Sequence, residues 1–197
     1  MTVFFTSDLH LGHQNVIKMN DRPFKDVDEM NRTLIQNINA RVSSRDTLWI
    51  LGDVSYKITR DEAIALISKI NCKDLHLVRG NHDKNWEGMD IFTEICDYKE
   101  IKAENGRRIC LMHYPLASWN GMHREAMHLH GHCHFGPDYN RTMFLQGFQR
   151  YDVGVDANDY YPVTLEDIFA KRKEGVSEDF FFQASHHKIA DLNGTFE

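Results

Sequence analysis

The sequence is poor in cysteine, and its four cysteines are not spaced for pairing. Cys72, Cys96, Cys110 and Cys133 lie at wide, irregular intervals with no C-x-x-C motif, which argues against a disulfide framework. Long apolar runs are also missing, since no stretch approaches about eighteen apolar residues. The N-terminus has no basic segment ahead of an apolar one. We therefore expect a reduced, cytoplasmic protein that is neither secreted nor inserted in a membrane.

A continuous basic surface is missing as well. The 23 Lys and Arg residues are outnumbered by 29 Asp and Glu, giving a net charge of −6, and they occur in short groups such as Arg107-Arg108. Extended nucleic-acid binding needs a long positive surface, so we do not expect it. Bound metal ions would add positive charge locally, so the net charge does not exclude a small anionic substrate. Nothing in the sequence indicates the oligomeric state.

Short strands and helices alternate in the first half of the chain. Apolar runs at residues 3–6, 47–51 and 75–78 predict buried strands. Apolar residues at helical spacing over 30–42, and the capping box Thr59-Arg-Asp-Glu62, predict helices between these strands. This β-α-β-α-β order is typical of a parallel sheet with crossover helices.

The pattern changes after residue 90. Predicted strands at 91–101 and 108–112 flank Asn105-Gly106, a strong hairpin signal, and indicate a second sheet that is mixed or antiparallel. Further elements are predicted as strands at 127–129 and 151–155 and a helix at 164–173. No repeat or linker divides the 197 residues, so we predict one domain over residues 1–175. Residues 176–197 would form a C-terminal tail that could dock on the same domain.

Five short blocks collect residues that can bind metal ions, and most of them directly follow a predicted strand. The ends of parallel strands meet at one edge of a sheet, where α/β proteins bind ligands. Any single block could be structural, because Asp and Asn often cap turns. Together, three Asp or Asn oxygens and four His nitrogens at one edge would suit two divalent metals side by side. The blocks are Asp8-Leu-His10, Gly52-Asp53, Gly80-Asn81-His82-Asp83, His113 and Gly131-His132-Cys-His134.

These blocks resemble the D-x-H, G-D, G-N-H-D/E, H and G-H-x-H motifs of the calcineurin-like metallophosphoesterases. The resemblance covers about residues 3–135 and extends to Gly154-Val155-Asp156. The run from Ser7 to His13, followed by Asn15-Val16-Ile17 and Arg22-Pro-Phe24, is similar to a compact subgroup of bacteria and phages. The resemblance implies a four-layered α/β sandwich, in which two mixed sheets flanked by helices carry a dinuclear metal site at the sheet edge.

The resemblance also implies a role for each residue of the blocks. Two metals would be bound, with Asp53 bridging them, His82 acting as general acid and Asp83 orienting His82. The ligands of the first metal would be Asp8, His10 and His134, and those of the second Asn81, His113 and His132. A nitrogen and oxygen ligand set without thiolate suits Mn, Fe, Zn or Ni. The family resemblance favours Mn.

Two positions depart from the family pattern. The segment Gly52-Asp53-Val-Ser-Tyr lacks the acidic or Asn residue that many relatives carry shortly after G-D. Cys133 stands where Thr or Ser is frequent, and alternation along an extended segment would turn it toward the core. Neither position is an expected ligand, so both departures bear on the substrate.

From these residues we predict a phosphoesterase that acts by in-line attack of a metal-bridging hydroxide. His82 would protonate the leaving alkoxide. A poor leaving group gains most from a general acid, which favours phosphodiesters, and the compact chain favours small, nucleotide-like substrates. A nuclease acting on DNA or RNA ends and a non-catalytic metal-binding scaffold are the alternatives.

Substrate contacts are less well defined by the sequence. His13 and Arg22 follow the first block and are candidates to bind a substrate phosphate, Arg22 through a bidentate contact. His13 could equally be structural, and for Arg22 an exposed loop arginine is the more common explanation. Loop aromatics such as Tyr114 could stack a nucleobase, and His130 shares the alternation of the last block and could face the cleft.

Overall fold

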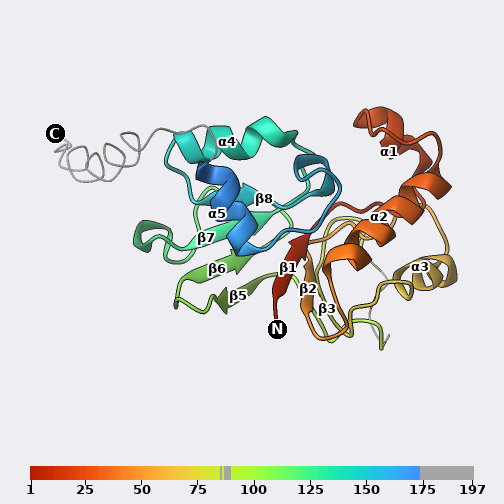
Figure 1. The fold of residues 1–197 in the computed structure, drawn as a ribbon, viewed down its shortest axis with the longest axis horizontal. Coiled ribbons are helices and arrows are strands. Elements are labelled where there is room, and N and C mark those ends of the chain that lie inside the picture. The colour runs from red at the N-terminus through yellow and green to blue at the C-terminus, as the bar shows by residue number, and fades with distance from the viewer. Residues whose placement is uncertain (85, 87–89, 174–197) are drawn as a thin grey trace.

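The computed structural model of this chain describes residues 1–84, 86 and 90–173. Two four-stranded sheets pack face to face, with helices on their outer sides (Figure 1). The predicted α/β architecture of two sheets flanked by helices is therefore confirmed. The tail predicted for residues 176–197 lies outside the described residues. Among the described residues, no helix is long and apolar enough to cross a membrane.

The first sheet is parallel between all four of its strands, as the alternating pattern predicts. An isolated antiparallel bridge between Phe5 and Val163 adds to its free edge. The strands are β1 (Val3–Thr6), β2 (Thr47–Ile50), β3 (Asp74–Val78) and β4 (Glu94–Cys96), in that order across the sheet. The connections contain α1 (Gln14–Met19), α2 (Val27–Arg41) and α3 (Arg60–Ile67).

Side-chain caps set where the crossover helices begin. Asp26 caps α2 by accepting a hydrogen bond from the Glu29 amide, so this helix starts before the predicted residue 30. Thr59 and Glu62 form the predicted reciprocal capping box of α3. The six-residue helix α1 was not predicted, because it is too short to display a helical period.

The second sheet is mixed. It contains β5 (Lys99–Lys102), β6 (Arg108–Leu111), β7 (Met127–His130) and β8 (Arg150–Asp152), in that order. Only β5 and β6 are antiparallel, joined by the predicted turn, where Gly106 takes a positive φ of 78°. The single strand predicted over 91–101 is wrong, because the chain passes from β4 in one sheet to β5 in the other.

Between β6 and residue 173, where the description of the chain ends, the structure also contains two helices and two 3₁₀ turns. The helix α5 (Leu165–Lys173) was predicted, and Thr164 and Asp167 exchange hydrogen bonds at its start. The helix α4 (Pro137–Leu145) was not predicted, although Pro137 occupies a favoured first-turn position. The 3₁₀ turns are η1 (Met122–Arg124) and η2 (Val155–Ala157).

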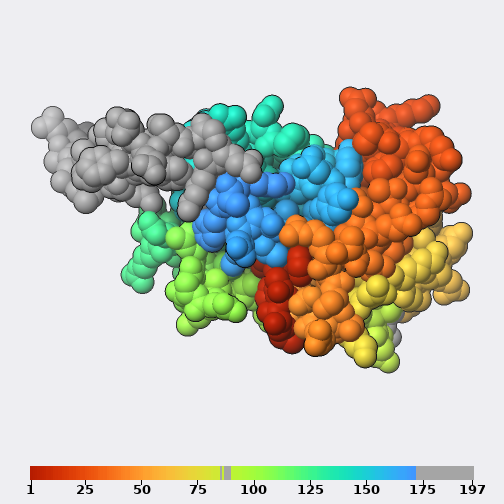
Figure 2. Space-filling view, viewed as in Figure 1, coloured from red at the N-terminus to blue at the C-terminus, as the bar shows by residue number. Residues whose placement is uncertain are grey.

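Alternation along the strands builds two apolar layers. Phe5 and Trp49 lie between the two sheets with Leu129, while their neighbours Phe4 and Leu48 pack with the helices α2 and α3. Figure 2 shows α2 and α5 meeting beside β1 on the outer surface. There, Arg41 of α2 donates to Asp167 of α5 at 2.8 Å.

Leu77→Ala should destabilise the protein by about 2–5 kcal/mol, because Leu77 is fully buried between the first sheet and its helices. The same substitution at Leu145, which is 42% exposed, should change the free energy of unfolding by less than about 0.5–1 kcal/mol. Urea unfolding followed by circular dichroism measures both values. Equal losses in the two variants would contradict this assignment of the core.

Candidate metal centre

The five blocks meet at the carboxyl ends of the strands, on one side of the molecule. The ligand atoms of Asp8, His10 and His134 lie within 4.8 Å of one another, and so do those of Asp53, His113 and His132. The structure thus brings together all six of these residues in two neighbouring groups, and each group contains one carboxylate and two imidazoles. The two groups could form a dinuclear metal site.

The first group is assembled from the ends of β1 and β7. The Nε2 atoms of His10 and His134 are 3.1 Å apart. His134 uses its other nitrogen, Nδ1, in a 2.7 Å hydrogen bond with Asp156. The fully buried Asp8 accepts hydrogen bonds from the His132 amide at 2.9 and 3.1 Å.

The second group is assembled from the ends of β2, β3, β6 and β7. His113 Nδ1 lies 2.8 Å from the carbonyl oxygen of Leu51, so this nitrogen carries the proton. Its other nitrogen, Nε2, lies 3.1 Å from Asn81 Oδ1 and 3.2 Å from His132 Nδ1. Asn81 therefore joins this group, as predicted from its place in the sequence block.

Asp53 lies between the two groups. Its Oδ2 atom is 3.5 Å from His10 Nε2 and 3.6 Å from His113 Nε2. Its Oδ1 atom accepts a hydrogen bond from the His82 amide at 3.0 Å. One carboxylate oxygen is thus near the ligand atoms of both groups, which is the geometry that a bridging carboxylate requires.

The donor set fits bound cations, because lone pairs are directed into both groups. With the proton of His113 on Nδ1, its Nε2 presents a lone pair to the Asn81 oxygen, which also only accepts. The Asp156 hydrogen bond likewise places the proton of His134 on Nδ1 and turns the Nε2 lone pair toward His10, whose own Nε2 donates or accepts according to its tautomer. Facing lone pairs repel unless a cation lies between them.

The ionisation of the site is shaped by burial. Burial raises the pKa of Asp8 to about 8, and the nearby Asp152 and Asp53 add to the rise. Burial and the neighbouring His134 and Arg22 lower the pKa of His10 to about 2, so this imidazole is neutral. Neutral imidazoles and a carboxylate short of compensating positive charge are suited to bind a divalent cation.

Many of these residues share an unusual backbone conformation. Five residues in the left-handed region hold the two groups together: Asp8, His10, Asp53, His132 and His134, with φ between 49° and 74°. Such a conformation is uncommon for residues other than glycine and is costly. The strand ends thus turn abruptly to direct side chains of successive residues toward the same centre.

Asp83 has a different position from the one predicted for it. Its carboxylate accepts hydrogen bonds from the amides of Asp53 at 2.6 Å, Gly80 at 2.9 Å and Val54 at 3.1 Å, and from the Trp86 indole at 3.2 Å. With these donors around it, Asp83 ties the Asp53 loop to the Gly80 loop and does not orient His82. Its effect on the site is exerted through Asp53.

The ring of His82 instead packs against Tyr56. The centroids of the two rings are 4.3 Å apart, and the His82 side chain is 31% exposed. Its Nε2 atom lies 3.9 Å from Asp53 Oδ2. Tyr56 was missed in the sequence because it belongs to no recognisable motif.

Arg22 also differs from the prediction that it binds substrate. Its side chain is fully buried and forms a two-point ion pair with Asp156, with both contacts at 2.8 Å. The guanidinium also donates to the carbonyl oxygens of Asp8 and Leu9. Arg22 is therefore a structural residue that supports the backbone of the first block at Asp8 and Leu9.

Asp156 links Arg22 to the metal-binding group. Although burial raises its pKa, the hydrogen bond with His134 and the charge of Arg22 outweigh this effect and hold the pKa at about 2. Burial lowers the pKa of His134, but the hydrogen bond to Asp156 and the charge of Asp8 raise it overall. The role of Asp156 was not predicted, since its partners are distant in the sequence.

The remaining candidates divide between the site and the core. His13 lies beside it, with its ring centroid 5.3 Å from that of His10 and 4.5 Å from that of Tyr56. A contact between His13 and substrate stays a prediction. His130 is fully buried on the outer face of the second sheet and does not face the cleft.

An α/β sandwich with two His/Asp groups at its strand ends defines a class of dinuclear metallohydrolase scaffolds. Residues 1–142 match the calcineurin-like phosphoesterase superfamily domain, and the chain belongs to this superfamily. The family prediction is thereby confirmed.

Similar proteins extend over most of the chain. The uncharacterized protein MJ1445 of Methanocaldococcus jannaschii is 31% identical over 174 residues, which cover 88% of this chain and 92% of that protein. The AQ665 protein of unknown function from Aquifex aeolicus has a similar structure, with a TM-score of 0.67 and 27% identity over 86% of this chain and 98% of that one. The gene 66 protein of Mycobacterium phage L5 is 39% identical over 82 residues, only 41% of this chain and 39% of the phage protein.

The metal-free protein should lose stability as the pH rises from 6.5 to 8. Asp8 keeps its proton up to about pH 8 when folded but releases it near pH 3.8 when unfolded, so the unfolded state binds fewer protons in this range. The pKa of His10 is lowered from 6.5 to about 2, so this residue makes stability rise with pH, but only below about pH 6.5. We expect a loss of about 1–2 kcal/mol in urea unfolding with chelator present.

Added Mn²⁺ should reverse this trend, because the cation binds ionised Asp8 and stabilises the folded state more at higher pH. Asp8→Asn should flatten the chelator-treated profile between pH 6.5 and 8. Asp159→Asn, at a side chain that is 85% exposed, should leave the profile unchanged. A wild-type profile that rises over this range in chelator would contradict the burial argument.

Proposed function

We propose that this protein is a metal-dependent phosphodiesterase that acts on small, nucleotide-like substrates. Membership of the calcineurin-like phosphoesterase superfamily and the two His/Asp groups support metal-dependent phosphoester hydrolysis. The observation that carries the proposal is the position of Asp53 Oδ2 close to imidazole nitrogens of both groups, with the partly exposed His82 beside it. A proton donor is thus available next to an anion-binding centre.

Seven residues would hold two divalent cations. One cation would be bound by Asp8, His10 and His134, the other by Asn81, His113 and His132, and Asp53 would contact both. When bound, two such ions activate water at neutral pH and offset the charge of the phosphoryl oxygens. We propose Mn as the native metal, with Fe, Zn and Ni as alternatives that suit the same ligands.

His82 would donate the proton that the leaving alkoxide needs. Its imidazole is partly exposed, while its own amide is bonded to Asp53, so its backbone position is fixed relative to the centre. Tyr56 restricts the ring from one side. A proton donor matters most for alkoxides that are poor leaving groups, and this favours an unactivated phosphodiester as substrate.

A hollow on the Asn81 side supports a nucleotide-like substrate. It has a volume of about 610 Å³ and is lined by Gly80, Asn81 and Tyr114 among others. Tyr114 is 38% exposed, and its ring centroid lies 4.6 Å from that of His132. An exposed aromatic ring at this distance from the centre could stack a base of the substrate.

Metal reconstitution tests the proposed function. Protein stripped of metal should be inactive, and Mn²⁺ should restore hydrolysis of bis(4-nitrophenyl) phosphate, with Fe²⁺, Zn²⁺ and Ni²⁺ tested separately. Asp53→Asn should lower kcat by about 1,000-fold or more, because it weakens the ligand shared by both cations. Asp159→Asn is the matched control. It should keep wild-type activity, because Asp159 is exposed and is not one of the candidate ligands.

Failure of every metal to restore activity would contradict the enzyme proposal. A partner protein retained on the metal-free chain would then favour the scaffold alternative. Preferential degradation of short DNA or RNA over mononucleotide diesters would favour the nuclease.

His82→Ala should slow the hydrolysis of an alkyl phosphodiester by about 100-fold or more, because its leaving group needs a proton. The same variant should slow the nitrophenyl diester less than about tenfold, because nitrophenolate leaves without one. Rates measured with saturating Mn²⁺ provide the comparison, and His123→Ala, at an exposed histidine, is the control. Equal losses on the two substrates would argue that His82 serves structure or metal binding.

A further inference from the structure

A hollow of about 510 Å³ opens directly beside His82. One wall is the segment from Ser55 to Arg60, which follows β2, and the other includes Asn81 and Lys84 after β3. The hollow shares Asn81 and His82 with the candidate metal centre, so the two adjoin each other.

The hollow is positively charged in a chain whose net charge is −6. Lys57, Arg60 and Lys84 line it, and the described residues that line it include no carboxylate. Glu62, in the helix that follows this wall, has a carboxylate that accepts hydrogen bonds from the amide and hydroxyl of Thr59. Among the described residues that line the hollow, Lys57 and Lys84 thus supply positive charge and no residue supplies a carboxylate.

Tyr56 fixes the shape of the hollow next to His82. Its ring packs against His82 at 4.3 Å and against His13 at 4.5 Å between centroids. The Lys57 ammonium lies 5.1 Å from the centre of the same ring. Lys57 is therefore held close to the imidazole that would donate the proton, and its charge lies on the same side of the centre.

Because the hollow and His82 lie on the same side of the centre, the hollow would receive the leaving group of the substrate. A general acid must reach the oxygen of the leaving group, and the leaving group departs opposite the attacking water. We propose that this hollow is a leaving-group subsite that selects an alcohol carrying a second anionic phosphate, such as a further nucleotide phosphate. The inference rests on the proposed phosphodiesterase function and names its substrate class.

The other hollows have a different character. The hollow beside Tyr114 combines Arg79 and Lys84 with Asp83 and Asp97, and Arg79 is paired with Asp97 at 2.6 Å. Its basic and acidic groups balance, so it offers no net attraction for a second phosphate.

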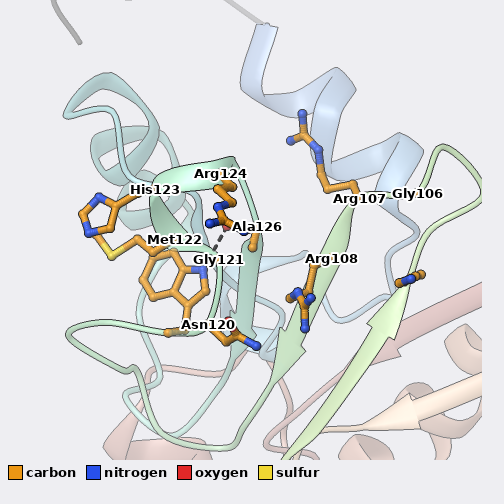
Figure 3. A pocket seen from close by; sticks show the side chains of 11 residues that line it. Gly106, Arg107, Arg108, Asn120, Gly121, Met122, His123, Arg124 and Ala126 are labelled. Carbon is orange, nitrogen blue, oxygen red and sulfur yellow. Dashed lines mark hydrogen bonds between the residues drawn. The ribbon is translucent and has the colours of Figure 1, made fainter. Parts of the chain in front are cut away.

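A larger cavity of about 650 Å³ contains more arginines but lies at the opposite end of the second sheet, where β6 and β7 begin (Figure 3). Figure 3 shows Arg107 and Arg108 pointing in different directions. Arg107 lies over the Phe169 ring at 5.0 Å, and Arg108 pairs with Glu100. These cations do not converge on one anion, and the cavity is not continuous with His82.

Two aryl diesters of thymidine 5′-phosphate test the subsite. One has 4-ethylphenol as leaving group and the other 4-(phosphonomethyl)phenol, which resembles it in size and adds an anionic phosphonate. With Mn²⁺ at low salt, kcat/KM should be about tenfold higher for the phosphonate ester, as expected for contacts with two exposed lysines. This preference should shrink when NaCl is raised, because salt screens the exposed charges.

The double variant Lys57→Gln/Lys84→Gln should reduce the preference to about twofold or less. Lys69→Gln removes the same kind of charge after the far end of α3 and should keep the wild-type preference. Equal kcat/KM for the two esters in the wild type, or an unchanged preference in the folded double variant, would overturn the inference while leaving phosphodiesterase activity intact. Absence of hydrolysis of either ester with every metal would instead remove the proposed function, and the subsite with it.

Discussion

The structure depends on keeping several lone pairs and carboxylates close together at one edge of two sheets. His10 and His134 approach to 3.1 Å, and Asn81 and His113 approach to the same distance, with lone pairs directed into both contacts. Burial makes the arrangement more costly, as the raised pKa of Asp8 indicates. A packed scaffold must therefore impose this geometry, or bound cations must compensate it.

The scaffold imposes it through buried hydrogen bonds that lie one step away from the ligand atoms. Asp83 accepts hydrogen bonds from the amides of Asp53, Val54 and Gly80, so it links the loops after β2 and β3. Arg22 links Asp156 to the backbone of Asp8, which joins the first block to η2. Removing either charge would leave its partners buried without compensation, which is costly.

Much of the fold and most of the centre could be predicted from the sequence. Strand ends are visible as apolar runs that stop at Gly52, Gly80 and Gly131, and the residues that follow them meet in space because parallel strands end at one edge. The tasks of Arg22 and Asp83 could not be predicted. Arg22 acts through a partner 134 residues away, and Asp83 acts through backbone amides, which leave no trace in the residue pattern.

Two sets of residues divide the proposed tasks of the site. The candidate ligands would bind the metals, and residues at the rim of the hollows would select the substrate. The candidate ligands are fixed by turns with positive φ and by buried carboxylates, so their positions tolerate little change. Tyr56, Lys57 and Tyr114 line the hollows at the rim, where Tyr56 packs against His82 and Tyr114 packs against His132. Under the proposed function, the metal geometry would stay fixed while the rim residues select the phosphoester, because loop residues can change without altering the strand ends that position the candidate ligands.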